Sequence, residues 1–136
     1  MLRFFLLILV VTILFGHAIS GIDWVHITSN VSDTPKPLLV RCQSKDDDLG
    51  YHTLYEGHEL SWTFNPNIFG RTLFFCHFYW NSKNKSFDVF TAHLSNAYCP
   101  KKGILGTDCY WTASQDGFRR VNRKKHNSYE LVYTWA

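Results

Sequence analysis

An apolar segment at the N-terminus constrains this chain most, because it decides which residues fold and in which redox environment. Residues 4–15 are almost entirely apolar, Arg3 precedes them, and Ala18 and Ser20 supply the small residues of a signal-peptidase site. A transmembrane anchor is the alternative interpretation. An uninterrupted span needs about 20 apolar residues, and this run is much shorter. The sequence therefore predicts a removable signal peptide over residues 1–20 and a secreted, extracellular chain.

Secretion determines how the four cysteines are interpreted. An even number of cysteines in a short secreted chain indicates disulfides. None of the four has the CxxC spacing of a zinc knuckle or a thioredoxin-like site. They are Cys42, Cys76, Cys99 and Cys109. We therefore expect two disulfides in one domain of residues 21–136, with all three connectivities open at this point.

The charge balance argues against one class of function. The whole chain has 14 basic and 11 acidic residues, and removal of the leader takes away one basic residue. A general nucleic-acid binder carries a strongly basic surface instead. No nucleic-acid partner is expected.

Alternating apolar and polar residues predict strands and almost no helix. Residues 59–64 alternate with the period of a half-buried strand, and residues 71–80 are apolar on both faces, as in a central strand. The expected strands cover 24–31, 38–43, 59–64, 71–80, 87–93, 107–113, 117–121 and 129–135. About eight short strands separated by turn residues predict an all-β fold, an antiparallel sandwich or barrel.

Three of the cysteines share a strand face with apolar residues. Cys42 alternates with Leu38 and Val40, Cys76 with Phe74 and Phe78, and Cys109 with Trp111 and Ala113. Each of these cysteines is expected to point toward the core, whereas Cys99 is expected in a loop before Pro100.

Little in the sequence points to catalysis or to a cofactor. Six histidines follow the leader, but none forms an HExxH motif or an i, i+4 pair, so we interpret them as structural. The run Asp46-Asp47-Asp48 lacks the glutamate of a calcium loop, since its twelfth position is Gly57. A turn in which Asp caps the backbone before Leu49-Gly50 is favoured. No metal and no cofactor are expected.

Two further chemistries depend on small sets of residues. A glycosidase needs paired carboxylates, and the chain offers only the glutamates Glu56, Glu59 and Glu130. Two Asn-x-Ser sequons begin at Asn30 and Asn84, and both are expected to be glycosylated in a secreted chain. Asn84 is expected near the exposed tip of a hairpin.

Several motifs together resemble one known family. They are VRCQSKDDDLG at residues 40–50, WTF at 62–64, FGRTLFFC at 69–76, CYW at 109–111 and DGF at 116–118. In this combination they resemble the plant self-incompatibility S-protein homologue family. The resemblance extends from about Trp24 to Trp135 and includes the four cysteines in order.

The resemblance implies a small secreted β-sandwich with two disulfides. It also implies a pairing of Cys42 with Cys109 and of Cys76 with Cys99. The first bridge would join an early strand to a late one, as a staple between sheets would.

Two functions are open, of which the resemblance implies the first. The first is a secreted, non-catalytic ligand that a cell-surface receptor recognises, as in the rejection of self pollen. The alternative is a glycan- or cell-wall-binding defence module, in which Trp24 or Trp111 would stack on sugars. A secreted hydrolase is a third interpretation, but it lacks a recognisable motif.

A basic segment is the candidate contact surface. Residues 117–126 read GFRRVNRKKH and contain no acid. The cations are Arg119, Arg120, Arg123, Lys124 and Lys125. They form either a solvated hairpin or a surface that attracts carboxylates on a receptor or on an acidic wall polysaccharide.

Overall fold

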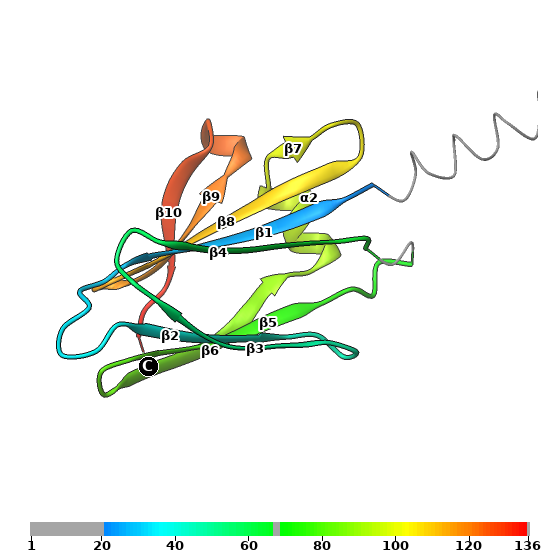
Figure 1. Ribbon diagram of the computed structural model, residues 1–136. Helices are drawn as coiled ribbons and strands as arrows, with labels where there is room; N and C mark the ends of the chain where they lie inside the picture. Colours follow the sequence, from blue (N-terminus) through cyan, green and yellow to red (C-terminus); the bar gives the residue numbers. More distant parts are fainter. Residues whose placement is uncertain (1–20, 67–68, 136) are drawn as a thin grey trace, which may run out of the picture.

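Residues 21–66 and 69–135 fold into two facing β-sheets, with the short helix α2 (Ala92–Tyr98) at one end (Figure 1). The computed structural model describes residues 21–66 and 69–135, so the expected leader lies outside the described residues. The elements are β1 (Asp23–Asn30), β2 (Leu38–Gln43), β3 (Asp48–Leu54), β4 (Glu59–Phe64), β5 (Phe74–Trp80), β6 (Lys83–Phe90), α2 (Ala92–Tyr98), β7 (Lys101–Lys102), β8 (Gly106–Ser114), β9 (Gly117–Asn122), the 3₁₀ helix η1 (Arg123–Lys125) and β10 (Ser128–Tyr133).

The two sheets have simple orders. The larger sheet runs β10-β9-β8-β1-β4, with β7 paired to the start of β8, and the smaller runs β3-β2-β5-β6. The β1–β8 pair is parallel, whereas the other pairs are antiparallel. The all-β sandwich predicted from the sequence is thus confirmed, with one parallel pair at the centre of its larger sheet.

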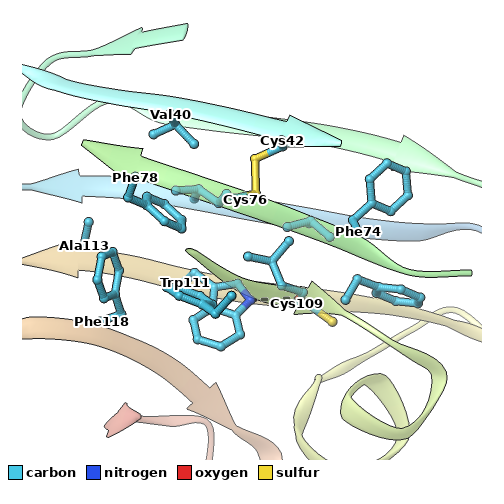
Figure 2. Packing of buried hydrophobic residues seen from close by; sticks show 14 of the residues in the cluster. Val40, Cys42, Phe74, Cys76, Phe78, Cys109, Trp111, Ala113 and Phe118 are labelled. Carbon is cyan, nitrogen blue, oxygen red and sulfur yellow. Dashed lines mark hydrogen bonds between the residues drawn. A yellow bond between two sulfur atoms is a disulfide. The ribbon is translucent and has the colours of Figure 1, made fainter. Parts of the chain in front are cut away.

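The core lies between the sheets, and strand alternation accounts for it. Along β1, β2 and β5 every second residue is buried, because successive side chains of a strand point to opposite faces. Figure 2 shows Val40 and Phe78 of the smaller sheet facing Trp111 and Phe118 of the larger one. The Trp111 indole N–H also donates to the Val89 carbonyl at 3.0 Å, which joins the two layers by a hydrogen bond.

The sequence did not predict strand β3 or helix α2. Strand β3 lies at a sheet edge and is mostly exposed, so its residues show no apolar alternation. Helix α2 has only seven residues, too few for a helical repeat. It begins where Thr91 accepts a hydrogen bond from the Leu94 N–H at 3.0 Å. The strand expected over 87–93 therefore ends earlier, at Phe90.

The disulfide pairing implied by the resemblance is wrong. The structure links Cys42 to Cys76, on adjacent strands of one sheet, and Cys99 to Cys109, ten positions along the chain. Cys42 and Cys76 lie directly opposite each other on the neighbouring strands β2 and β5, with Cα atoms 4.1 Å apart. Cys42 and Cys109 belong to different sheets (Figure 2). Cys42 meets Cys76 on the adjacent strand of its own sheet, so its sulfur is not available to Cys109 across the core.

We expect non-reducing peptide mapping to recover these two bridges. The double variant Cys42→Ala/Cys76→Ala should lose about 2–4 kcal/mol of unfolding free energy, because the unfolded chain regains the freedom of the closed loop. Urea titration measures this loss. A peptide in which Cys76 is joined to Cys99 would contradict the observed pairing.

Candidate functional site

The five predicted contact cations do not form one exposed loop. Arg119 and Arg120 are consecutive residues of β9, so their side chains point to opposite faces of the larger sheet. The remaining cations, residues 123–125, make up η1. The segment thus divides into a strand part and a turn part, with different surroundings.

Arg119 is neutralised by its own hairpin. Its two terminal nitrogens donate to both carboxylate oxygens of Asp116, at 2.7 and 2.8 Å. These hydrogen bonds lower the pKa of the Asp116 carboxyl and raise the pKa of Arg119. The sequence segment held no acid, but the turn just before it supplies one.

Arg120 is a core residue, which removes it from the predicted contact surface. It is only 8% exposed. Its guanidinium carbon lies 3.6 Å from the centre of the Tyr98 ring and 5.4 Å from that of Trp111. One of its terminal nitrogens is 3.5 Å from the Glu130 carboxylate. Arg120 therefore serves packing and charge balance between α2 and the larger sheet.

Glu130 also partners the turn. It accepts hydrogen bonds from Lys125 at 3.3 Å and from Asn122 at 3.1 Å. Burial by itself raises the pKa of Glu130, but these hydrogen bonds and the positive charges of Lys125 and Arg120 together outweigh it, so the pKa of this carboxyl is lowered. One carboxylate thus stabilises the conformation of the β9–β10 connection.

The turn itself is exposed but held in place. The Asn122 side chain caps η1 by accepting from the Lys124 N–H at 2.9 Å, and the Arg123 guanidinium donates to the Asn96 carbonyl in α2. Arg123, Lys124 and Lys125 all remain exposed. Three of the five predicted cations are therefore presented to solvent on a defined backbone.

A second basic segment, which the sequence analysis did not select, lies at the same end of the sandwich. The Cys99–Cys109 disulfide closes a short loop in which β7 carries Lys101 and Lys102. At its tip Ile104 is 89% exposed and Leu105 is 48% exposed. The sequence of this loop contains two lysines and two apolar residues between Cys99 and Cys109. These residues indicate a presented surface loop only when the two cysteines are known to bond to each other.

Helix α2 connects these two segments. It contacts η1, β8 and β9, and Figure 1 shows β7 and the β9–β10 connection at the same end of the molecule. We call this region the basic end. It comprises Lys101, Lys102, Arg123, Lys124 and Lys125. Two acids contact it: Glu130 lies 3.3 Å from Lys125, and Asp108 lies 3.9 Å from Lys102.

Next to the basic end, His26 occupies the outer face of the larger sheet. Its ring nitrogens lie 2.8 Å from a Glu59 oxygen and 2.9 Å from an Asp108 oxygen, on the strands that flank β1. The ring is stacked against Trp24 and Tyr110. His26 thus joins three neighbouring strands, in agreement with its interpretation as a structural residue.

The two tryptophans considered for sugar binding are engaged within the protein. Trp111 is 1% exposed, in the core. The Trp24 ring stacks on His26 and lies 4.4 Å from the Lys102 ammonium. Trp111 is therefore inaccessible to a sugar, and Trp24 is half-buried with two partners inside the protein.

The aspartate run at residues 46–48 has a structural role. Asp48 begins β3, pairs with Arg41 at 2.6 Å and accepts from the Gly50 N–H at 2.9 Å. The capped-turn interpretation of the aspartate run is thus confirmed. The hydrogen bond from Arg41, then that from Gly50, lowers the pKa of the Asp48 carboxyl.

Two of the glutamates are too far apart to act as a pair. Glu59 and Glu130 lie on the opposite edge strands, β4 and β10, of the larger sheet. Four strand spacings of about 4.8 Å separate them, whereas glycosidase carboxyl pairs lie about 5–9.5 Å apart. Within residues 21–66 and 69–135 no group of three or more His, Cys, Asp or Glu side chains is placed to hold a metal ion. In the same ranges no helix is long and apolar enough to cross a membrane.

Both sequon asparagines are exposed. Asn30 is the last residue of β1. Asn84 lies in β6, just after the turn of the β5–β6 hairpin, rather than in the turn itself. Their glycosylation stays a prediction.

Replacing Arg120 should destabilise the protein far more than replacing its neighbour. Arg120→Ala removes a buried cation from two aromatic rings and from Glu130, and we expect a loss of about 2–4 kcal/mol. Arg119→Ala breaks an exposed ion pair, and its cost should stay below about 1 kcal/mol. Urea unfolding of the two variants makes the comparison, and equal losses would contradict a core role for Arg120.

Acid should destabilise the protein in a defined range. Asp48, Asp116 and Glu130 have lowered pKa values in the folded state, so the unfolded chain binds protons more readily at these sites. Their stabilisation is complete above the unfolded values, near pH 4–4.5, and is lost as pH falls through the folded values. We expect unfolding free energy to decline below about pH 4, and Glu130→Gln to show a shallower decline.

Comparison with known proteins identifies the family. The family described as plant self-incompatibility protein S1 matches residues 24–135. The chain is 37% identical over 117 residues to S-protein homolog 5 of Arabidopsis thaliana, which covers 82% of this chain and 85% of that protein. It is 32% identical over 111 residues to S-protein homolog 29 of the same plant, with coverage of 82% and 76%.

A third relative is longer. S-protein homolog 2 of Arabidopsis thaliana is 38% identical over 98 residues, which cover 72% of this chain but only 59% of that protein. No solved structure shows a significant match to the chain. Since the family match spans nearly all the described residues and confirms the resemblance, the chain belongs to the plant self-incompatibility S1 family of S-protein homologues.

Proposed function

We propose that this protein is a secreted, non-catalytic ligand that a cell-surface receptor recognises through the basic end. The apolar leader and the two disulfides support secretion, because disulfides persist in oxidising compartments. Membership of the S1 family supports a role in recognition, for which pollen–pistil self-incompatibility is one setting.

The observation that carries the proposal is the loop closed by Cys99–Cys109. It presents two lysines and the exposed Ile104 and Leu105 on a backbone that the disulfide and the β7–β8 pairing hold in place. A loop already fixed in one conformation loses little entropy on binding, which favours affinity. Exposed aliphatic side chains beside cations are suited to an apolar pocket with acidic residues around it.

The cations set the kinetics of such an encounter. Positive charge attracts an acidic receptor surface and mainly raises the association rate, and salt weakens this attraction over a Debye length of about 8 Å. An acidic wall polysaccharide would also be attracted by charge. The burial of Trp111 removes one of the two tryptophans that this alternative would use for sugar stacking.

Two matched variants test the proposal. Lys101→Ala/Lys102→Ala/Lys124→Ala removes three cations from the basic end, and Lys36→Ala/Lys45→Ala/Lys83→Ala removes three exposed cations elsewhere. Alanine is chosen because serine at position 83 or 124 would create a new Asn-x-Ser sequon. Each set contains one lysine above a tryptophan ring, Lys102 on Trp24 and Lys83 on Trp80, so that contact is controlled for.

We expect the first variant to associate with responsive plant cells roughly tenfold more slowly at low salt, and the difference to shrink as salt rises. The control variant should match the unsubstituted protein. Labelled protein on pistil and leaf cells gives both the rate and the organ that responds. If both variants, correctly folded, bind as the unsubstituted protein does, the basic end is not the contact surface.

A further inference from the structure

We propose that Asn84 carries an N-linked glycan whose first N-acetylglucosamine packs on the ring of Tyr79, beside His77. This inference rests on the secretion included in the proposed function, since the modification occurs only in the secretory pathway. It concerns the outer face of the smaller sheet, which the proposed receptor contact does not use.

The sequon is accessible. Asn84 and Ser86 are both exposed, and as residues two apart in β6 they point to the same face. Strand β6 is the edge of the smaller sheet, with β5 on one side. A modifying enzyme can therefore reach both side chains and the backbone between them.

An aromatic surface lies next to the asparagine. Tyr79 is directly opposite Asn84 in the β5–β6 register, and side chains in such pairs are separated by about 5 Å at Cβ. The His77 ring stacks on Tyr79 with centroids 4.1 Å apart and planes inclined by 11°. Tyr51 from β3 extends the surface, at 6.4 Å from Tyr79. The Arg41 guanidinium, held by Asp48, lies 5.0 Å from the Tyr51 ring.

The asparagine amide is already oriented toward these rings. Its Oδ1 accepts a hydrogen bond from His77 Nε2 at 3.1 Å. A glycan is attached through Nδ2, the other corner of the same amide, so this hydrogen bond and the modification are compatible. With Oδ1 held by His77, Nδ2 points away from the His77 ring, and the first sugar begins beside Tyr79, the residue opposite Asn84 in the register.

The chemistry of the two surfaces is complementary. One face of the N-acetylglucosamine ring presents C–H groups with little polarity, and their weakly positive hydrogens are attracted to the negative face of an aromatic ring. Packing also removes apolar surface of Tyr79 from water. The other sequon lacks this arrangement, because the neighbour of Asn30 across the β1–β8 pair is Ser114.

Such a glycan would protect the sheet without blocking recognition. Exposed edge strands invite pairing with other chains, and a sugar over β6 prevents this. Figure 1 shows the β5–β6 hairpin in the layer opposite β7 and the β9–β10 connection. A glycan on Asn84 therefore leaves the basic end open.

The test is a comparison of melting temperatures of protein secreted by eukaryotic cells. Ser86→Ala removes the sequon and keeps Asn84, Tyr79→Ala removes the ring, and the double variant completes the cycle. Asn30→Gln is the control for a glycan without a ring beneath it. Glycopeptide mass spectrometry reports occupancy, and trimming by an endoglycosidase to one N-acetylglucosamine isolates the first sugar.

We expect Asn84 to be occupied and the glycosylated protein to melt about 3–6 °C above Ser86→Ala. The gain should survive trimming and disappear in the Tyr79→Ala background, while Asn30→Gln changes little. An unmodified Asn84 in secreted protein, or a gain that persists without Tyr79, overturns the inference. Neither outcome bears on cell binding, and a failure of cell binding leaves the melting comparison intact.

Discussion

A buried carboxylate at the start of β1 fixes the arrangement on which the rest of the structure depends. Asp23 is only 5% exposed, and one of its oxygens accepts from both the N–H and the hydroxyl of Thr107, at 2.7 and 3.0 Å. The Thr107 hydroxyl lies 2.6 Å from that of Ser95 in α2. An unpaired buried carboxylate is costly, so Asp23 sets the point at which β8 meets β1.

That point determines the position of the loop that the second disulfide closes. The parallel β1–β8 pair runs on from it, with Val25 opposite Cys109 and Ile27 opposite Trp111. The register therefore fixes the position of Cys109, which forms the second disulfide, and of Trp111, whose indole donates a hydrogen bond to the other sheet. It also fixes where the loop between Cys99 and Cys109 leaves the sheet. A contact between residues 84 positions apart in the sequence thus controls the geometry of the basic end.

The sequence predicted the strands that bury a face and missed the elements that do not. In β1, β2 and β5 the buried residues alternate as the apolar residues do in the sequence, so these strands could be predicted from that spacing. Strand β3 owes its structure to pairing with β2 rather than to its own pattern. Similarly, the disulfides depend on which strands are neighbours, and no residue spacing in the chain specifies that order.

At the candidate site, too, the sequence predicts features of a single segment but not the contacts between segments. Counting charges along residues 117–126 found a basic segment, but it could not separate Arg119 from Arg120, which face opposite sides of one strand. Nor could it find Asp116 and Glu130, which neutralise the segment from outside it. The loop that contains β7 could not be predicted as a presented surface, because the Cys99–Cys109 bridge that closes it is specified only by the fold.

The loop and the sheets have separate physical requirements. The core is built mainly from strand faces, and the tip residues Ile104 and Leu105 do not belong to it. Their conformation is held by the Cys99–Cys109 bond and by the β7–β8 pairing, which involve backbone and cysteine atoms rather than the tip side chains. Substitutions at the tip therefore change what a partner meets at almost no cost to folding. Such a scaffold can carry many different loop surfaces on one β-sandwich.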